Sequence, residues 1–267
     1  ADLVASDDRR VVVFRGPLSA GTHDETTATL RVTPADSDVS GTGTVAVADL
    51  DGDGHAELVA GTDCGYDGRG GDVNLAGIAA DVNGALTFAD RDHFLWWIEC
   101  ADDGPYEASV AGDVDGDGHL DLAVGGPHGA YVVRGPLVGE VDVVAAARVA
   151  VLADVANGEL LTGAPVSLGD LDGDGLAEVA FGGYVGTTLR VTVLAGTRTG
   201  LLQPGTWDVA FTGGAGDHKV PWLRAGLDLD GDSVGDLLIS ALPSTDPTAV
   251  GHVWWLSGAS ILPPNPQ

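Results

Sequence analysis

The sequence contains the nine-residue stretch Asp113-Val114-Asp115-Gly116-Asp117-Gly118-His119-Leu120-Asp121. Carboxylates stand at its first, third, fifth and ninth positions, and glycine stands at the sixth. A hard divalent cation such as Ca²⁺ takes oxygen ligands from alternate side chains and one backbone carbonyl, and the glycine permits the sharp turn. The stretch therefore predicts a calcium-binding loop.

The same pattern occurs three more times, at 49–57, 170–178 and 228–236. In each loop we predict four carboxylates and the backbone carbonyl of the seventh residue as metal ligands. The predicted ligands are Asp49, Asp51, Asp53, His55 and Glu57 in the first loop, Asp113, Asp115, Asp117, His119 and Asp121 in the second, Asp170, Asp172, Asp174, Leu176 and Glu178 in the third, and Asp228, Asp230, Asp232, Val234 and Asp236 in the fourth. Ser233 replaces the sixth-position glycine of the fourth loop, so we expect that loop to bind calcium most weakly.

The ninth loop position gives the period of a repeat. Asp2, Glu57, Asp121, Glu178 and Asp236 are separated by 55, 64, 57 and 58 residues. Asp2 is included because 2–18 parallels 121–137, so we expect the chain to begin just after a loop whose first eight positions are missing. A period of this length indicates units that bury their faces against their neighbours. We predict one domain over 1–267, with units at about 1–43, 44–107, 108–164, 165–222 and 223–267.

Each unit is predicted to form four short strands, because short runs rich in β-branched and aromatic residues alternate with turn residues. The first strand enters the acidic loop, as at 44–48, and the second leaves it, as at 57–60, 121–124, 178–181 and 236–239. Third strands are expected at 11–14, 131–133, 189–194 and 253–256, and fourth strands at 29–32, 94–98 and 207–211. Repeated four-stranded antiparallel units favour an all-β β-propeller, with a solenoid as the alternative. About eighteen strands are expected, with three in each terminal unit, so the end units are incomplete. We therefore expect either that the chain is part of a longer propeller or that its open ends pair with another chain.

The unit resembles the FG-GAP repeat of integrin α-subunit propellers and related bacterial proteins. The acidic positions of that family's Asp-x-Asp-x-Asp-Gly-x-x-Asp loop are matched at all four sites, and its Gly-Ala-Pro segment is similar to Gly125-Gly126-Pro127. The resemblance implies a calcium-binding propeller that binds a protein or carbohydrate ligand on the face opposite the calcium loops. Candidate residues on that face are Tyr66, Arg69, Tyr106, His128, Tyr184, His218, Lys219 and Trp222.

The composition is strongly acidic, with a formal net charge of -28. Such a charge disfavours nucleic acid and anionic membranes as partners. The four loops hold 16 of the 40 acidic residues, and four Ca²⁺ would bring the charge to -20. No uninterrupted apolar run is long enough to insert in a membrane, and no signal-peptide pattern is seen at the start.

Two cysteines, Cys64 and Cys100, fall in loops that the strand order places on the side away from the metals. We predict that they form a disulfide, because millimolar calcium and oxidising conditions both occur outside the cytosol. A free pair in a cytosolic protein is the alternative. The favoured location is therefore extracellular, either secreted or on the cell surface.

The function expected from these observations is an extracellular, calcium-stabilised adhesion or ligand-binding module. The second expectation is a structural subunit that assembles with other copies through its incomplete edge blades. A third is a polysaccharide-lyase-like enzyme, since some of those enzymes also use calcium-loaded propellers. We predict no enzyme and no catalytic residues, because the chain has no Gly-x-Ser-x-Gly, His-Glu-x-x-His or glycine-rich phosphate loop.

Overall fold

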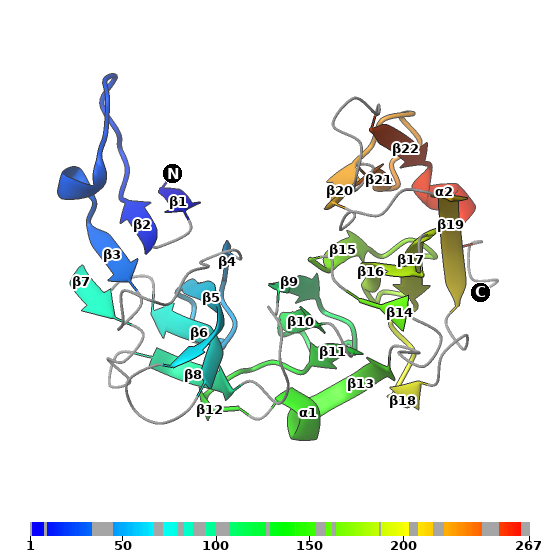
Figure 1. The fold of residues 1–267 in the computed structure, drawn as a ribbon, viewed down its shortest axis with the longest axis horizontal. Coiled ribbons are helices and arrows are strands. Elements are labelled where there is room, and N and C mark those ends of the chain that lie inside the picture. Colours follow the sequence, from blue (N-terminus) through cyan, green and yellow to red (C-terminus); the bar gives the residue numbers. More distant parts are fainter. Residues whose placement is uncertain are drawn as a thin grey trace. The chain divides into compact units, whose positions relative to one another are not determined.

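The computed structural model describes residues 2–7, 10–33, 45–66, 72–79, 83–87, 94–99, 107–126, 129–141, 143–152, 159–161, 164–186, 188–202, 208–215, 222–241 and 251–262. These ranges contain twenty-two β-strands and only three short helices, η1 (Glu25–Thr27), α1 (Val143–Ala146) and α2 (Gly258–Ile261), so the predicted all-β class is confirmed (Figure 1). None of the described helices has the length and apolar character needed to cross a membrane. The chain divides into two compact units, 1–108 with 137–143 and 109–136 with 144–267.

The first unit contains two sheets. Sheet 1 has the order β1 (Leu3–Asp7), β2 (Arg10–Phe14), β3 (Leu30–Thr33) and β7 (Gly84–Thr87). Sheet 2 has the order β4 (Val45–Ala48), β5 (Glu57–Tyr66), β6 (Asp72–Ala79), β8 (Phe94–Glu99) and β12 (Gly139–Glu140).

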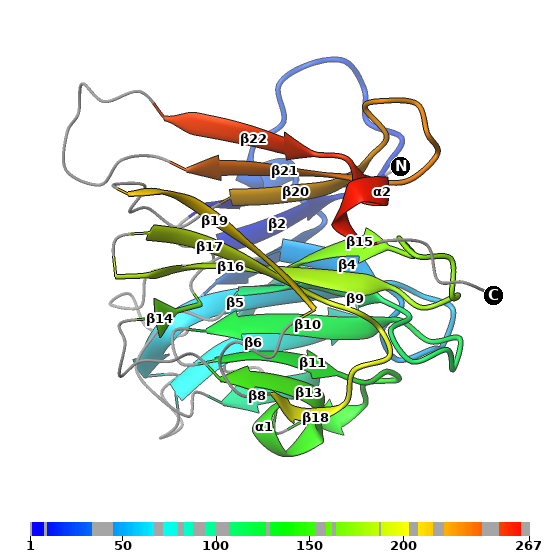
Figure 2. The ribbon, with the colours of Figure 1, turned by 90° about the vertical axis from the view of Figure 1, so that its right-hand side faces the viewer.

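The second unit contains three sheets, whose strands are seen side by side in Figure 2. Sheet 3 has the order β9 (Glu107–Gly112), β10 (Asp121–Gly126), β11 (Gly129–Val133), β13 (Ala147–Leu152) and β18 (Gly200–Leu202). Sheet 4 comprises β15 (Val166–Gly169), β16 (Glu178–Val185), β17 (Thr188–Leu194) and β19 (Val209–Ala215), with β14 (Glu159–Leu160) also paired to β16. Sheet 5 has the order β20 (Trp222–Leu227), β21 (Asp236–Ala241) and β22 (His252–Leu256).

The sheets follow the predicted order of strands. Within each repeat the predicted strands pair in chain order, and every predicted strand overlaps an observed one. β5 extends as far as Tyr66, so Cys64 lies in a strand and the prediction that places it in a loop is wrong. The first and last repeats each supply three such strands, and each of the three middle repeats supplies four, as the sequence predicts. The propeller arrangement of these sheets stays a prediction.

Four short strands were not predicted, and three of them, β7, β12 and β18, share one topology. Each lies between the third and fourth strands of its own repeat, yet pairs in parallel with the fourth strand of the preceding repeat. Each begins at a glycine with positive φ, which allows the chain to turn back: Gly84 at 111°, Gly139 at 74° and Gly200 at 80°. The sheets of the first three repeats therefore each contain a strand from the repeat that follows.

The core of the second unit lies on both faces of sheet 4. Val179 and Phe181 of β16 are buried with residues of sheet 3, whereas Ala180 between them is buried with Leu223 and Ile239 of sheet 5. This alternation follows from the two-residue period of a strand. Sheet 4 is thus apolar on both faces, which explains why β16 is a continuous apolar run in the sequence.

Candidate metal sites

Each acidic loop is a turn between the first and second strands of a repeat, and its first carboxylate organises it. In the first loop, Asp49 Oδ1 accepts the N–H of Gly52 at 2.8 Å, and Oδ2 accepts the N–H of Gly54 at 3.0 Å. The first aspartates of the other three loops accept the equivalent pair of N–H groups, at 2.6–3.0 Å. The four loops therefore share one backbone conformation.

Two positions in each loop have a left-handed backbone. The glycines at position 4 have φ of 78–83°, and those at position 6 have φ of 88–90°. Ser233 occupies position 6 of the fourth loop at φ 71°, where a side chain is sterically disfavoured. Position 4 therefore favours glycine for the same reason as position 6, the only position for which a glycine requirement was predicted.

The loops bring carboxylate oxygens together. In each loop three acidic residues offer oxygens that all lie within 4.8 Å of one another. The groups are Asp49, Asp51 and Asp53; Asp113, Asp115 and Asp121; Asp170, Asp172 and Glu178; and Asp228, Asp230 and Asp236. Hard oxygen donors at this spacing fit a divalent cation such as Ca²⁺.

The remaining predicted ligands lie in the same loops but outside those groups. They are Glu57, Asp117, Asp174 and Asp232, together with the seventh residues His55, His119, Leu176 and Val234. In each loop, the backbone N–H of the residue at position 7 donates to the carboxylate at position 5, at 2.8–2.9 Å. The fifth and seventh positions are therefore joined by one turn in every loop.

The carboxylate at position 9 of each loop is buried. It can accept hydrogen bonds both from the loop and from the chain that follows the third strand. In the second loop, Asp121 Oδ2 accepts the N–H of Val114 at 2.9 Å, and Oδ1 accepts the N–H of Gly135 at 2.8 Å. Gly135 lies just after β11, so this side chain fastens the loop to the end of the third strand. The equivalent acceptor and glycine pairs are Asp2 with Gly16, Glu178 with Gly196, and Asp236 with Gly258.

Three of these glycines, Gly135, Gly196 and Gly258, are required because a side chain would collide with neighbouring atoms. A Cβ on Gly135 would lie 2.4 Å from the carbonyl oxygen of Leu120, and a Cβ on Gly258 would lie 2.1 Å from that of Gly235. On Gly196 it would lie 2.5 Å from the Cβ of Leu176. This role of glycine was not predicted from the sequence, although a glycine follows the third strand at each position.

Burial disfavours the ionised form of three of the ninth-position carboxylates. Burial raises the pKa of Glu57 and of Asp121, and it raises the pKa of Glu178 to about 7. Neighbouring aspartates in the loops raise these pKa values further. A cation among the oxygens would remove this cost.

The fourth loop has an additional donor. Burial raises the pKa of Asp236, but the N–H groups of Gly258 and Leu229 and the indole N–H of Trp255 lower it by more, so the net shift is downward. The indole nitrogen of Trp255 lies 2.9 Å from Asp236 Oδ2. This contact holds the carboxylate in its charged form.

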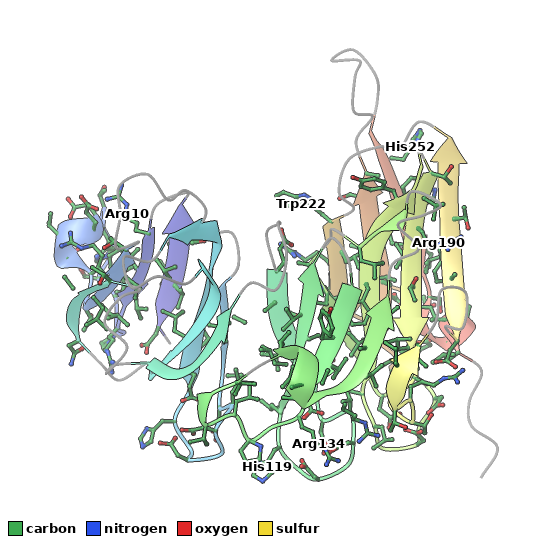
Figure 3. The ribbon with its side chains drawn as sticks, turned by 60° about the horizontal axis from the view of Figure 1, so that its bottom comes forward. Arg10, His119, Arg134, Arg190, Trp222 and His252 are labelled. Atoms are coloured by element: carbon green, nitrogen blue, oxygen red, sulfur yellow. The ribbon has the colours of Figure 1, made fainter. Side chains whose placement is uncertain are left out.

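Figure 3 shows His119 and Arg134 at the end of the second unit where its loops lie, and Trp222 and His252 toward the other end. Of the candidates for a ligand-binding face, Tyr184 lies in β16 and is partly buried, and Trp222 begins β20 with 70% of its surface exposed. Tyr66 is the last residue of β5, but its side chain is not among those that the structure describes. Arg69, Tyr106, His128, His218 and Lys219 lie outside the described residues, as do Cys100 and the side chain of Cys64, so the predicted disulfide stays a prediction.

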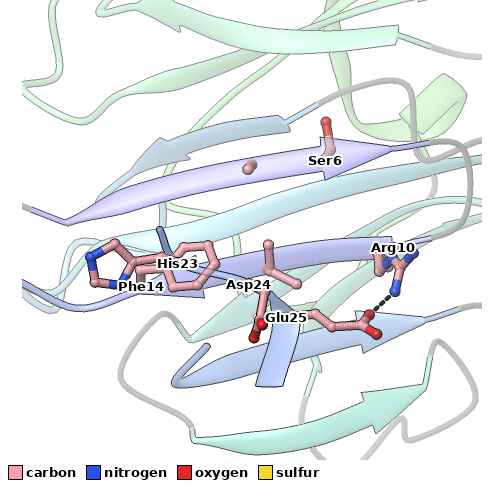
Figure 4. A pocket seen from close by; sticks show the side chains of 8 residues that line it. Ser6, Arg10, Phe14, His23, Asp24 and Glu25 are labelled. Atoms are coloured by element: carbon pink, nitrogen blue, oxygen red, sulfur yellow. Dashed lines mark ion pairs between the residues drawn. The ribbon is translucent and has the colours of Figure 1, made fainter. Parts of the chain in front are cut away.

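A separate pocket of about 320 Å³ lies on one face of sheet 1 (Figure 4). Val12 and Phe14 line it, and His23 packs edge-on against Phe14 with ring centroids 6.0 Å apart. Arg10 forms an ion pair with Glu25 at its rim. The pocket contains no group of acidic residues like those of the loops.

Comparison of the chain with protein-family models finds no matching family, and comparison with curated proteins finds no match.

Proposed function

We propose that this chain is an extracellular β-propeller module stabilised by four Ca²⁺ ions, and that it adheres to a protein or carbohydrate ligand. The observation that carries the proposal is the repeated loop geometry, in which four separate turns gather three carboxylates by the same backbone hydrogen bonds. Four anionic turns with the same backbone hydrogen bonds favour a common counter-ion. Calcium fits the all-oxygen donor set and the loop spacing.

Five sheets in chain order support a propeller. In sheets 2, 3 and 4 the strand that enters an acidic loop is followed across the sheet by the next three strands of its repeat, in chain order. Repetition of such sheets about a central axis is the architecture of a propeller. The resemblance to FG-GAP repeats, based on the loops, supports the same arrangement and the adhesive function.

The metal requirement can be measured by thermal melting in calcium and in EGTA. If each loop has a dissociation constant of ~0.1 mM, ~1 mM calcium stabilises the folded chain by about 1.4 kcal/mol per loop, or roughly 5–6 kcal/mol in total. At about 2–4 °C per kcal/mol, EGTA should lower the Tm by roughly 10–20 °C. Equal melting temperatures in the two buffers would contradict the proposal.

Site-specific variants sharpen this experiment. Asp170→Asn removes the first carboxylate of the third loop, so calorimetry should count one calcium ion fewer than in the unmodified chain. Glu25→Gln is the matched control, because Glu25 is a partly exposed acid outside the loops. A stoichiometry that falls equally in both variants would mean that binding depends on overall charge.

The adhesive function needs its own assay. Immobilised extracellular-matrix proteins and acidic and neutral polysaccharides would be presented to the calcium-loaded chain, with the EGTA-treated chain as the control. Calcium-dependent capture by one class supports adhesion and names the ligand class. No capture by either class would contradict it.

An assembly function is the second candidate, because one face of sheet 5 exposes three large apolar side chains beside Arg224. Trp222 and Val253 lie on this face through their pairing with Ser240, and they are 70% and 71% exposed. Trp255 lies on the same face and is 50% exposed. Large exposed apolar residues that cluster in this way are typical of protein interfaces. Light scattering should then show oligomers that Trp222→Ser dissociates, whereas a monomer at all concentrations would exclude this function.

A further inference from the structure

The second acidic loop differs from the others in its contacts with arginine. The side chain of Asp115, its third position, is fully buried and is paired with both Arg134 and Arg148. In the part of the chain that the structure describes, the equivalent Asp51, Asp172 and Asp230 have no arginine partner. Two positively charged guanidinium groups therefore lie beside the second loop, and the described parts of the other three loops have no such pair at position 3.

The two arginines approach the same oxygen of Asp115. The Nε and Nη2 atoms of Arg134, which follows β11, both contact Oδ2, and Nη1 of Arg148 in β13 lies 3.0 Å from it. Arg134 is 57% exposed, whereas Arg148 is only 14% exposed. Asp115 is thus enclosed by one accessible and one buried guanidinium.

Arg148 is held in place by a second set of contacts. Its Nη2 donates to the carbonyl oxygen of Gly196 at 3.1 Å, and its Nε donates to that of Arg198 at 3.3 Å. Both carbonyls belong to the turn that follows the third strand of the next repeat. A guanidinium tethered to two carbonyls keeps its charge at the loop whether or not a metal ion is present.

The charges of the loops differ accordingly. All four loops contain four carboxylates, but in the second loop two positive side chains offset half of that charge. Without a metal ion this loop is less self-repulsive than the others. A divalent ion that enters it meets two positive charges at an oxygen it would use, and this lowers the affinity.

We propose that Arg134 and Arg148 are a built-in counter-ion of the second loop, which keeps that loop folded without metal and weakens its affinity for Ca²⁺ about tenfold relative to the third loop. This inference deepens the proposed calcium binding and rests on it. The fourth loop, with Ser233, is weakened for a different reason, since its cost lies in the backbone conformation.

The primary test is Arg134→Gln, because Arg134 is exposed and its replacement leaves the core unchanged. Calcium titration by calorimetry should show one site that binds about tenfold more tightly than in the unmodified chain. Arg134→Lys keeps the charge and should retain the weak site. In an Asp113→Asn background, which disables the second loop, Arg134→Gln should have no effect on the remaining sites.

The same variant should have the opposite effect without metal. In EGTA, Arg134→Gln should lower the Tm by more than Arg10→Gln, the control, because Arg10 is an arginine paired with Glu25 away from the acidic loops. The comparison of melting temperatures in EGTA tests whether the arginine is a counter-ion even if the unmodified chain binds no calcium. Absence of calcium binding by the unmodified chain would contradict only the proposed function. Unchanged or weaker calcium binding in Arg134→Gln, or equal melting of the two variants in EGTA, would overturn the inference.

Discussion

Replacement of Gly258 by alanine should destabilise the fourth acidic loop, although Gly258 lies outside that loop in the sequence. The N–H of Gly258 donates to Asp236 Oδ1 at 3.0 Å, and an added Cβ would lie 2.1 Å from the carbonyl oxygen of Gly235. Relief of that overlap requires the backbone to move by about 1 Å, and overpacking of this kind costs about 1–3 kcal/mol. The movement also breaks a hydrogen bond to a buried carboxylate, which is worth roughly 1.5–3 kcal/mol.

The two contributions total roughly 2.5–6 kcal/mol, so the Tm measured in EGTA should fall by roughly 5–24 °C. Gly231→Ala is the matched control in the same loop, because its added Cβ has no atom within 4 Å and the cost comes from φ +83° alone. That strain is about 1–2 kcal/mol. A Gly258→Ala protein that melts at or above the temperature of Gly231→Ala would refute the close-approach argument.

Three further changes have expected outcomes. Ser233→Gly should raise the Tm by about 2–4 °C and tighten one calcium site, since glycine removes roughly 1 kcal/mol of left-handed strain at φ 71°; an unchanged Tm would count against this. Burial raises the pKa of Glu178 from 4.5 to about 7, so ionisation of this carboxyl increasingly destabilises the metal-free fold as the pH rises through that range. In EGTA, Glu178→Gln should therefore reduce the loss of Tm between pH 5 and pH 8. An identical pH profile of the Tm in the two proteins would contradict this. Thr192→Val should raise the Tm by about 2–4 °C, because the buried Thr192 hydroxyl has no hydrogen-bond partner among the described residues; a lower Tm would indicate that it has one.

The loops and main strands could be predicted from the sequence because their causes are local. Carboxylate spacing at 113–121 reflects neighbouring side chains in one turn, and the apolar run at 179–181 reflects a strand buried on both faces. Both patterns repeat, so each occurrence supports the others. The all-β class follows directly from them.

The contacts that complete the sites depend on residues far apart in the chain. The approach of Gly135 to Leu120 arises only when the second and third strands are in register, and the pairing of Arg148 with Asp115 also needs the fourth strand in place. A glycine after a strand or an arginine within one has many ordinary explanations in a sequence. The parallel strands β7, β12 and β18 were missed because they are short and their partners belong to another repeat.

Those parallel strands mean that the period of the sequence is not the boundary of a separable module. An excised segment 108–164 would carry β12, which belongs to the sheet before it, and would lack β18, which finishes its own. During synthesis, sheet 3 stays open at its outer edge until the following repeat has emerged as far as Leu202. Recombined or shortened arrays of these repeats should therefore be joined between a donated strand and the fourth strand that follows it in the chain, so that each donated strand stays in one segment with the strand it pairs with.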